Sequence, residues 1–94
     1  MELKIAYSKF KNREEAYQYV STRLKEQGLS GLPIQVEFQF KDTEKVIEAN
    51  GKGLKLVAHF EDQQLLIKIE LGLLYRAFQN RVGDLVEKQL KIFL

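Results

Sequence analysis

Residues 53–94 read GLKLVAHFEDQQLLIKIELGLLYRAFQNRVGDLVEKQLKIFL, and they carry the strongest pattern in the chain. Within residues 54–60 and again within residues 65–71, apolar side chains return at every second position. This alternation predicts two strands that each turn one face toward a core. The polar residues 61–64 between them predict a turn, so we expect an antiparallel hairpin. The apolar face would consist of Leu54, Leu56, Ala58, Phe60, Leu65, Ile67, Ile69 and Leu71.

From about Leu73 the spacing of the apolar residues changes to steps of three and four, which predicts an amphipathic helix to the end of the chain. Its apolar side would carry Leu74, Phe78, Val82, Leu85, Val86 and Phe93. Gly72 stands where strand gives way to helix, and glycine tolerates the backbone angles of a sharp change of direction. We expect Gly83 to be tolerated on the polar side of the helix and Gln89 to be partly exposed.

The sequence pattern in the first half of the chain predicts one helix and three strands. They are a strand over residues 2–7, a helix from Asn12 to Gly28, a strand over residues 35–41 and a short strand over residues 45–49. Asn12 is suited to cap the helix, with Glu15 reaching back as in a capping box. Gly28 is a typical helix stop. Asn50 and Gly51 form a tight-turn dipeptide before the next strand.

These elements predict a single α+β domain over residues 1–94, in the order β-α-β-β-β-β-α. We expect a mostly antiparallel sheet with both helices on one face, because each helix has one apolar side to bury. The other face of the sheet would then be largely polar. It is expected to carry Glu37, Gln39, Lys55, Val57, His59, Leu66, Lys68 and Glu70.

Composition narrows the class of protein. The chain has no cysteine, which excludes a disulfide framework and a thiol nucleophile and favours a reducing compartment. Residues 1–6 alternate polar and apolar residues, and no uncharged apolar run is long enough to cross a bilayer. We therefore expect a cytoplasmic protein without a transmembrane segment. The net charge of +2 is too small for the dense basic face typical of nucleic-acid binding.

No catalytic constellation is evident in the sequence. His59 is the only histidine, and an isolated histidine on a polar strand face is typical of a solvated side chain. Glu61 and Asp62 are neighbours in a turn, where carboxylates point apart into water instead of facing one bond. The run from Gly51 to Gly53 lacks the spacing and the following hydroxyl residue of a phosphate loop. The sequence therefore predicts a non-enzymatic protein with no metal and no cofactor.

Five residues are candidates for binding. Val57 and Leu66 would place apolar surface on the otherwise polar face of the sheet. At the start of the last helix, Tyr75, Arg76 and Phe78 combine aromatic and guanidinium groups, which are common at protein interfaces. An alternative is that Tyr75 and Phe78 anchor the helix to its own sheet.

Residues 50–90 carry a recognisable order of features. A glycine turn at residues 51–53 leads into a strand, an acidic turn (Glu61-Asp62) and a strand that ends in LGLL at residues 71–74. RAF at residues 76–78 and a helix closing on Val86 and Leu90 follow. This order resembles the polyhydroxyalkanoic acid system proteins, small bacterial proteins encoded near polyester granule genes. The resemblance implies a non-enzymatic role in intracellular polyester storage, with the granule surface or a granule protein as partner. It implies no particular binding residues.

Two other functions remain open on the residues alone. The first is a protein-interaction module or homodimer that uses the outer sheet face or an exposed edge strand. The second is a small ligand-binding protein or enzyme with a pocket between helices and sheet, which would need convergent polar groups there.

Overall fold

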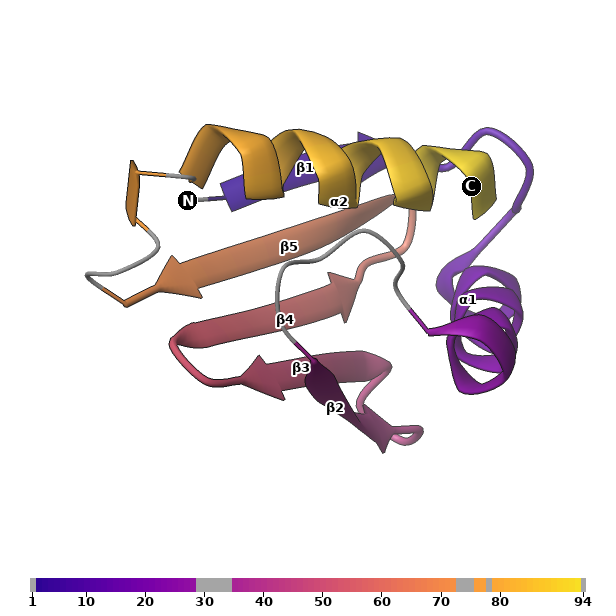
Figure 1. Ribbon diagram of the computed structural model, residues 1–94. Coiled ribbons are helices and arrows are strands. Elements are labelled where there is room, and N and C mark those ends of the chain that lie inside the picture. Colours follow the sequence, from indigo (N-terminus) through magenta and orange to yellow (C-terminus); the bar gives the residue numbers. More distant parts are fainter. Residues whose placement is uncertain (1, 29–34, 73–75, 78, 94) are drawn as a thin grey trace.

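The computed structural model describes residues 2–28, 35–72, 76–77 and 79–93. It has a five-stranded antiparallel sheet and two helices, in the predicted order β-α-β-β-β-β-α (Figure 1). The α+β class and the antiparallel sheet are therefore confirmed. The elements are β1 (Glu2–Ala6), α1 (Arg13–Gln27), β2 (Val36–Lys41), β3 (Val46–Gly51), β4 (Leu54–Phe60), β5 (Gln64–Leu71) and α2 (Gln79–Phe93).

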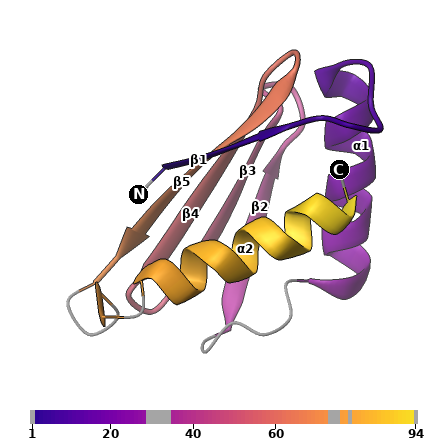
Figure 2. The same cartoon turned by 90° about the horizontal axis from the view of Figure 1, so that it is seen from above.

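The strands lie in the order β1-β5-β4-β3-β2. The last four strands of the chain form a meander of hairpins, because each connection between them is only a few residues long. β1 joins this meander at the far side of β5, also antiparallel. β1 and β2 are consequently the two edges of the sheet. Both helices lie on one side of it, as predicted (Figure 2).

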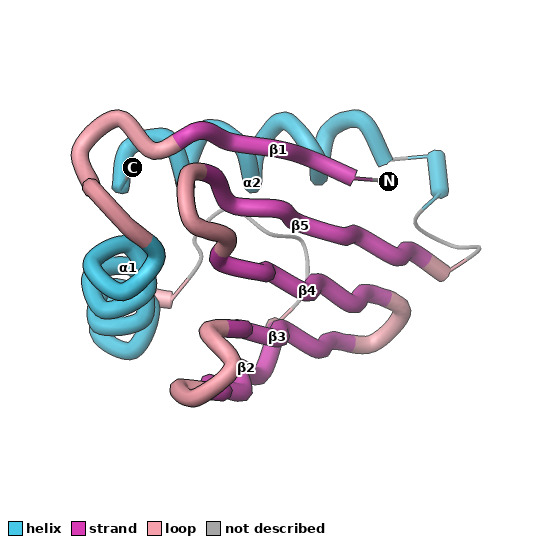
Figure 3. Tube along the Cα trace, turned by 180° about the vertical axis from the view of Figure 1, so that it is seen from behind, coloured by secondary structure: helices cyan, strands magenta, loops and turns pink. Residues whose placement is uncertain are grey.

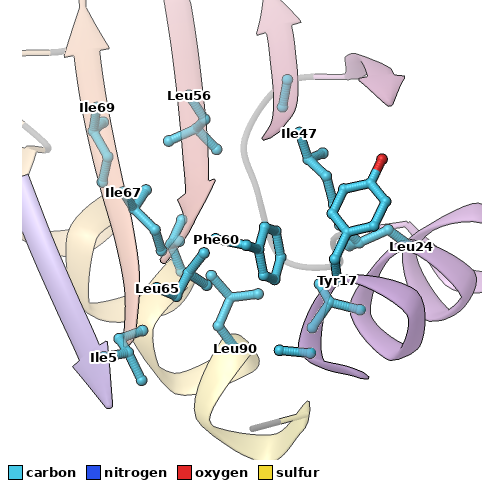
Figure 4. Close-up of a cluster of buried hydrophobic side chains, with 14 of the residues drawn as sticks. Ile5, Tyr17, Leu24, Ile47, Leu56, Phe60, Leu65, Ile67, Ile69 and Leu90 are labelled. Carbon is cyan, nitrogen blue, oxygen red and sulfur yellow. The ribbon is translucent and has the colours of Figure 1, made fainter. Parts of the chain in front are cut away.

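The core fills the space between the helices and this inner face of the sheet. The predicted apolar face of β4 and β5 is confirmed, since Leu65 and Ile67 in β5 are 0% and 1% exposed. Figure 4 shows Tyr17 of α1, Phe60 of β4 and Leu90 of α2 gathered in this layer. The rings of Tyr17 and Phe60 meet edge to face, with centroids 5.3 Å apart. Each helix is thus held by the same central strands.

The ends of α1 follow the predicted capping chemistry in part: Asn12 caps the helix and Gly28 ends it, but Glu15 reaches the N–H of Lys11 instead of that of Asn12, which a capping box would require. The backbone N–H of Glu15 donates to Asn12 Oδ1 at 3.0 Å, and Glu15 Oε1 accepts from the backbone N–H of Lys11 at 3.2 Å. At the other end, Gly28 has a φ of +66° and its N–H donates to the carbonyl of Leu24 at 2.9 Å. These bonds satisfy backbone groups that a helix leaves open at its ends.

The turn between β3 and β4 lies two residues later than predicted. Asn50 and Gly51 are the last residues of β3, and Gly51 stands opposite Leu54 in the register. The loop is therefore Lys52-Gly53, and Gly53 supplies the left-handed residue with a φ of +79°. The prediction of a turn at Asn50-Gly51 is wrong. This dipeptide has the composition of a turn, but in the structure both of its residues pair with β4.

The joint between β5 and α2 also differs from the prediction. Arg76 and Ala77 form a short 3₁₀ turn, and the α-helix begins only at Gln79. Residues 73–75 and 78 lie outside the described part of the chain. Gly72 lies beside Gly53: its N–H donates to the Gly53 carbonyl at 2.7 Å, and an added Cβ would lie 3.4 Å from Gly53 Cα, which is an ordinary van der Waals contact. Gly72 is not among the described residues with a positive φ.

The exposure of two positions inside α2, Gly83 and Gln89, was also predicted. Gly83 is buried next to Val82, so its predicted place on the polar side is wrong. Gln89 is half-buried, in agreement with the prediction. The helix therefore turns a wider surface inward than its apolar residues alone indicate.

Candidate functional site

The outer face of the sheet, opposite the helices, holds the candidate site. In Figure 3 the sheet is seen from this side, and neither α1 nor α2 crosses in front of the strands. The register places Val46, His59 and Leu66 next to one another in one row across β3, β4 and β5. Val57 lies diagonally from Leu66, within reach of a neighbouring side chain. We call Val46, Val57, His59 and Leu66 the outer patch.

The outer patch is partly accessible. Val57, His59 and Leu66 are half-buried, while Val46 is only 9% exposed. The sheet thus brings the two predicted residues Val57 and Leu66 together in its middle. Val46 was missed by the sequence reasoning, because the residue beside His59 depends on which strand pairs with β4.

Charged side chains surround the outer patch on the same face. They are Glu2, Lys4, Glu37, Lys41, Glu48, Lys55, Lys68 and Glu70. Opposite charges face each other across the strands, as with Glu2 and Lys68 or Lys55 and Glu70. Because lysine and glutamate balance here, this face does not offer a polyanion the dense positive charge it would need.

One ion pair of this ring is well formed. Lys41 Nζ lies 2.6 Å from Glu48 Oε2. The hydrogen bond from Lys41 lowers the pKa of Glu48, and the positive charges of Lys41 and Lys55 lower it further. The same hydrogen bond raises the pKa of Lys41. Both groups therefore stay ionised at neutral pH beside the outer patch.

At one end of the outer face His59 borders a shallow polar hollow. The hollow is lined by Arg13, Glu44, His59, Phe60, Glu61, Asp62, Leu66 and Lys68. Arg13 Nε lies 3.8 Å from Asp62 Oδ1, and the carbonyl of Glu61 accepts a hydrogen bond of 2.7 Å from the Tyr7 hydroxyl. Polar groups thus converge around His59 more than the sequence indicated. The Asp62 side chain is 81% exposed, so water screens its charge.

The hydroxyl of Tyr7 at this end is itself perturbed. Burial, followed by the negative charges of Glu61 and Asp62, raises the pKa of Tyr7 to about 12.

Within the described residues, no group of three or more His, Cys, Asp or Glu side chains is placed to hold a metal ion.

The remaining predicted residues lie elsewhere. Arg76 is exposed in the 3₁₀ turn beyond the end of β5, whereas Leu66 lies near the beginning of that strand. The structure does not bring Arg76 into the outer patch. Tyr75 and Phe78 lie outside the described residues, so their predicted role stays a prediction.

A second surface of contact-forming residues was not predicted. On the outward side of α1, the rings of Phe10 and Tyr19 lie 5.3 Å apart, and the Arg23 guanidinium lies 5.9 Å from the Tyr19 ring centroid. Tyr19 is 42% exposed. Phe10 precedes the helix and follows no period, so nothing in the sequence pattern linked it to Tyr19.

Comparison of the chain with protein-family models, with curated proteins and with solved structures finds no match. Within the part of the chain that is described, neither helix is long and apolar enough to span a membrane. The site must therefore be interpreted from its own geometry and from the sequence pattern.

Proposed function

We propose that the protein is a non-enzymatic cytoplasmic binding protein that acts in intracellular polyester storage, with the outer patch as its contact surface. The partner would be the granule polymer or a protein on the granule surface. Support comes from the resemblance of residues 50–90 and from one structural observation. That observation is the outer patch, whose Val57 and Leu66 are half-buried on a sheet face that the helices leave uncovered.

The chemistry of the outer patch suits weak and reversible contact. Removing apolar surface from water contributes roughly 25 cal/mol per Å², so the two half-exposed aliphatic side chains, Val57 and Leu66, provide on the order of 1–2 kcal/mol. The charged ring around them remains hydrated and prevents unspecific collapse onto other proteins. Binding at one such patch is expected to be weak, and several copies on one granule would strengthen it.

Co-sedimentation with purified polyester granules, beside bare hydrophobic beads, tests this function. Leu66→Lys places a charge in the outer patch and should reduce retention on granules about tenfold, since a buried charge without a partner is costly. Gln27→Lys adds the same charge to an exposed position at the end of α1, away from the outer face, and should leave retention unchanged. Equal retention of the wild-type protein on granules and beads, or none on granules, would exclude polyester as the specific partner.

A second candidate function is a protein-interaction module or homodimer. The observation that favours it is the β2 edge, which pairs with β3 on one side and with no described strand on the other. An unpaired edge strand presents backbone donors and acceptors to another chain.

A small-ligand carrier has less support. The cavity between helices and inner face is about 30 Å³ and is lined by apolar core residues such as Val20, Leu56 and Val86. One water molecule needs about 10–15 Å³ on this measure, so the cavity has room for two or three waters and not for a metabolite. Binding a metabolite there would require the core to rearrange.

A further inference from the structure

The edge strand β2 has a sequence that is complementary to a second copy of itself in an antiparallel pair. Residues 36–41 read VEFQFK, and β2 runs antiparallel to β3 with Glu37, Gln39 and Lys41 on the outer face. If two such strands pair antiparallel about Gln39, residues at equal distances before and after Gln39 stand opposite each other. Glu37 then faces Lys41 of the second copy, and Phe38 faces Phe40 of the second copy.

We propose that two copies of the chain join through their β2 strands in this register, so that the two sheets continue as one. The occupant of the edge is a second copy because the charges are complementary to themselves. The ion pair between Glu37 and Lys41 and the aromatic pair between Phe38 and Phe40 each form twice, as a two-fold axis requires. Shifting the register by two residues puts Glu37 opposite Gln39 or Thr43 instead of Lys41, and a shift by one would put side chains on the wrong face.

The inner face of β2 supports the same partner. Phe38 and Phe40 point to the core side, yet both are only half-buried, because β2 lies at the border of the helical layer. Their rings stack with centroids 5.9 Å apart, and Lys25 Nζ lies 4.8 Å from the Phe40 ring centroid. A second β2 strand would cover these rings with two more phenylalanines, and aromatic pairs of this kind stabilise sheets.

The opposite edge of the sheet lacks this combination. β1 has Leu3 and Ile5 on its inner face, and Ile5 is only 4% exposed, since α2 packs along this strand (Figure 1). The aromatic surface that a partner could cover is at β2. The β1 edge therefore provides a matched control.

Joining at β2 has a consequence for the outer face. A two-fold axis perpendicular to the sheet keeps both outer faces on the same side, so two copies of the outer patch would face one surface. This inference rests on the second candidate function, a homodimer through the β2 edge, and is independent of polyester binding, because the edge and the outer patch share no residue.

A charge exchange tests the register. We expect the wild-type protein to dimerise with a Kd on the order of 10 µM, as suits one short strand pair. Glu37→Lys and Lys41→Glu should each weaken the dimer about tenfold or more, since each replaces two ion pairs by like charges. An equimolar mixture of the two variants should recover the wild-type Kd in sedimentation velocity. Lys4→Glu, on the β1 edge, should leave the Kd unchanged.

Several outcomes would overturn the proposal. They are a wild-type protein that stays monomeric at about 1 mM, single variants with an unaltered Kd, a mixture that does not recover, and equal weakening by Lys4→Glu. Thermal unfolding of each variant shows whether it is folded. Retention of the wild-type protein on granules is measured separately, so failure of the dimer and failure of polyester binding are distinguishable.

A cross-link provides a second test that does not depend on charge. The natural chain has no cysteine, so Gln39→Cys introduces a single thiol. Opposed residues of an antiparallel pair have Cα atoms about 4.5–5.5 Å apart, which a disulfide can bridge. We expect Gln39→Cys to form a disulfide dimer at least tenfold faster than Lys55→Cys, which lies in the middle of the outer face. Equal rates would contradict the register.

Discussion

Leu65 and Leu66 are neighbours in β5, but they belong to the two different faces of the sheet. Leu65 is 0% exposed between the sheet and the helices, whereas Leu66 is half-buried on the outer face beside His59. The inner face is covered by both helices, and the outer face is covered by neither (Figures 2 and 3). The comparison indicates that apolar residues on the inner face act in stability and that Val57 and Leu66 of the outer patch remain partly accessible.

Replacing each leucine by alanine gives the largest expected difference between the faces. Leu65→Ala should lower the free energy of unfolding by about 3 kcal/mol, since it removes a buried side chain and leaves a cavity. Leu66→Ala should lower it by about 1 kcal/mol or less, because its neighbours on the outer face are partly hydrated. Urea unfolding followed by circular dichroism measures both values. Equal losses would show that the outer patch is part of the core.

The next largest effect concerns a polar group at the border of the core. The Tyr17 hydroxyl donates a hydrogen bond of 2.6 Å to Asp42 Oδ1, and burial together with this bond raises the pKa of Tyr17. A folded-state pKa above the ordinary value of about 10 means that the fold favours the neutral phenol. Its stabilisation is complete below pH 10 and is lost as the pH rises through the folded-state pKa.

Tyr17→Phe should therefore lower the free energy of unfolding by about 1–2 kcal/mol at pH 8. Between pH 10 and 12 the variant should lose less stability than the wild-type protein. Urea unfolding at several pH values measures this slope. Tyr19→Phe, at a 42% exposed position on the same helix, serves as the control and should keep the wild-type slope. A Tyr17→Phe protein with the full alkaline loss would contradict the role of this hydrogen bond.

The smallest effect is expected for the ion pair on the outer face. The pKa of Glu48 is lowered by its hydrogen bond to Lys41, so the pair contributes stability above the ordinary glutamate value of 4.5. This contribution disappears as the pH falls through the folded-state pKa. Glu48→Gln should thus be slightly less stable than the wild-type protein at pH 7, and the difference should vanish at pH 2.5. An unchanged difference at pH 2.5 would mean that packing, not charge, is responsible.

The assignment of residues to faces was predictable from the sequence. In β4 and β5 the alternation places Leu54, Leu56, Leu65 and Ile67 inward, and all of them are buried. A period of two determines the face of every residue once one face is apolar. The outward positions of Val57 and Leu66 follow from the same rule, and so this part of the candidate site was also predictable.

The start of α2 after β5 and the turn between β3 and β4 were not predictable from such alternation. The apolar spacing of residues 73–78 continues that of the helix, although Arg76 and Ala77 form a 3₁₀ turn before it. Periodicity reports which side is apolar and not where the hydrogen bonding of the α-helix begins. Asn50-Gly51 has the composition of a turn, but the pairing of Gly51 with Leu54 moves the loop to Lys52-Gly53.

The order in which the strands pair was the feature least predictable from the sequence. Val46 belongs to the outer patch only because β3 lies beside β4, and Phe38 is half-buried only because β2 is an edge. Strand order depends on contacts between distant residues, which alternation within one strand does not contain. The place of Val46 in the outer patch and the position of β2 at the edge therefore became visible only with the structure.

The methyl groups of Leu65 and Leu66 allow the most direct test of the account. In a methyl-labelled protein, a soluble paramagnetic agent should broaden the NMR signals of Leu66 and Val57 and leave those of Leu65 and Ile67 sharp. Addition of polyester particles should then protect Leu66 and Val57 from the agent. Signals of Leu66 that are already protected in the free protein, or that stay equally broadened with particles bound, would contradict the claim that the outer patch is an open contact surface.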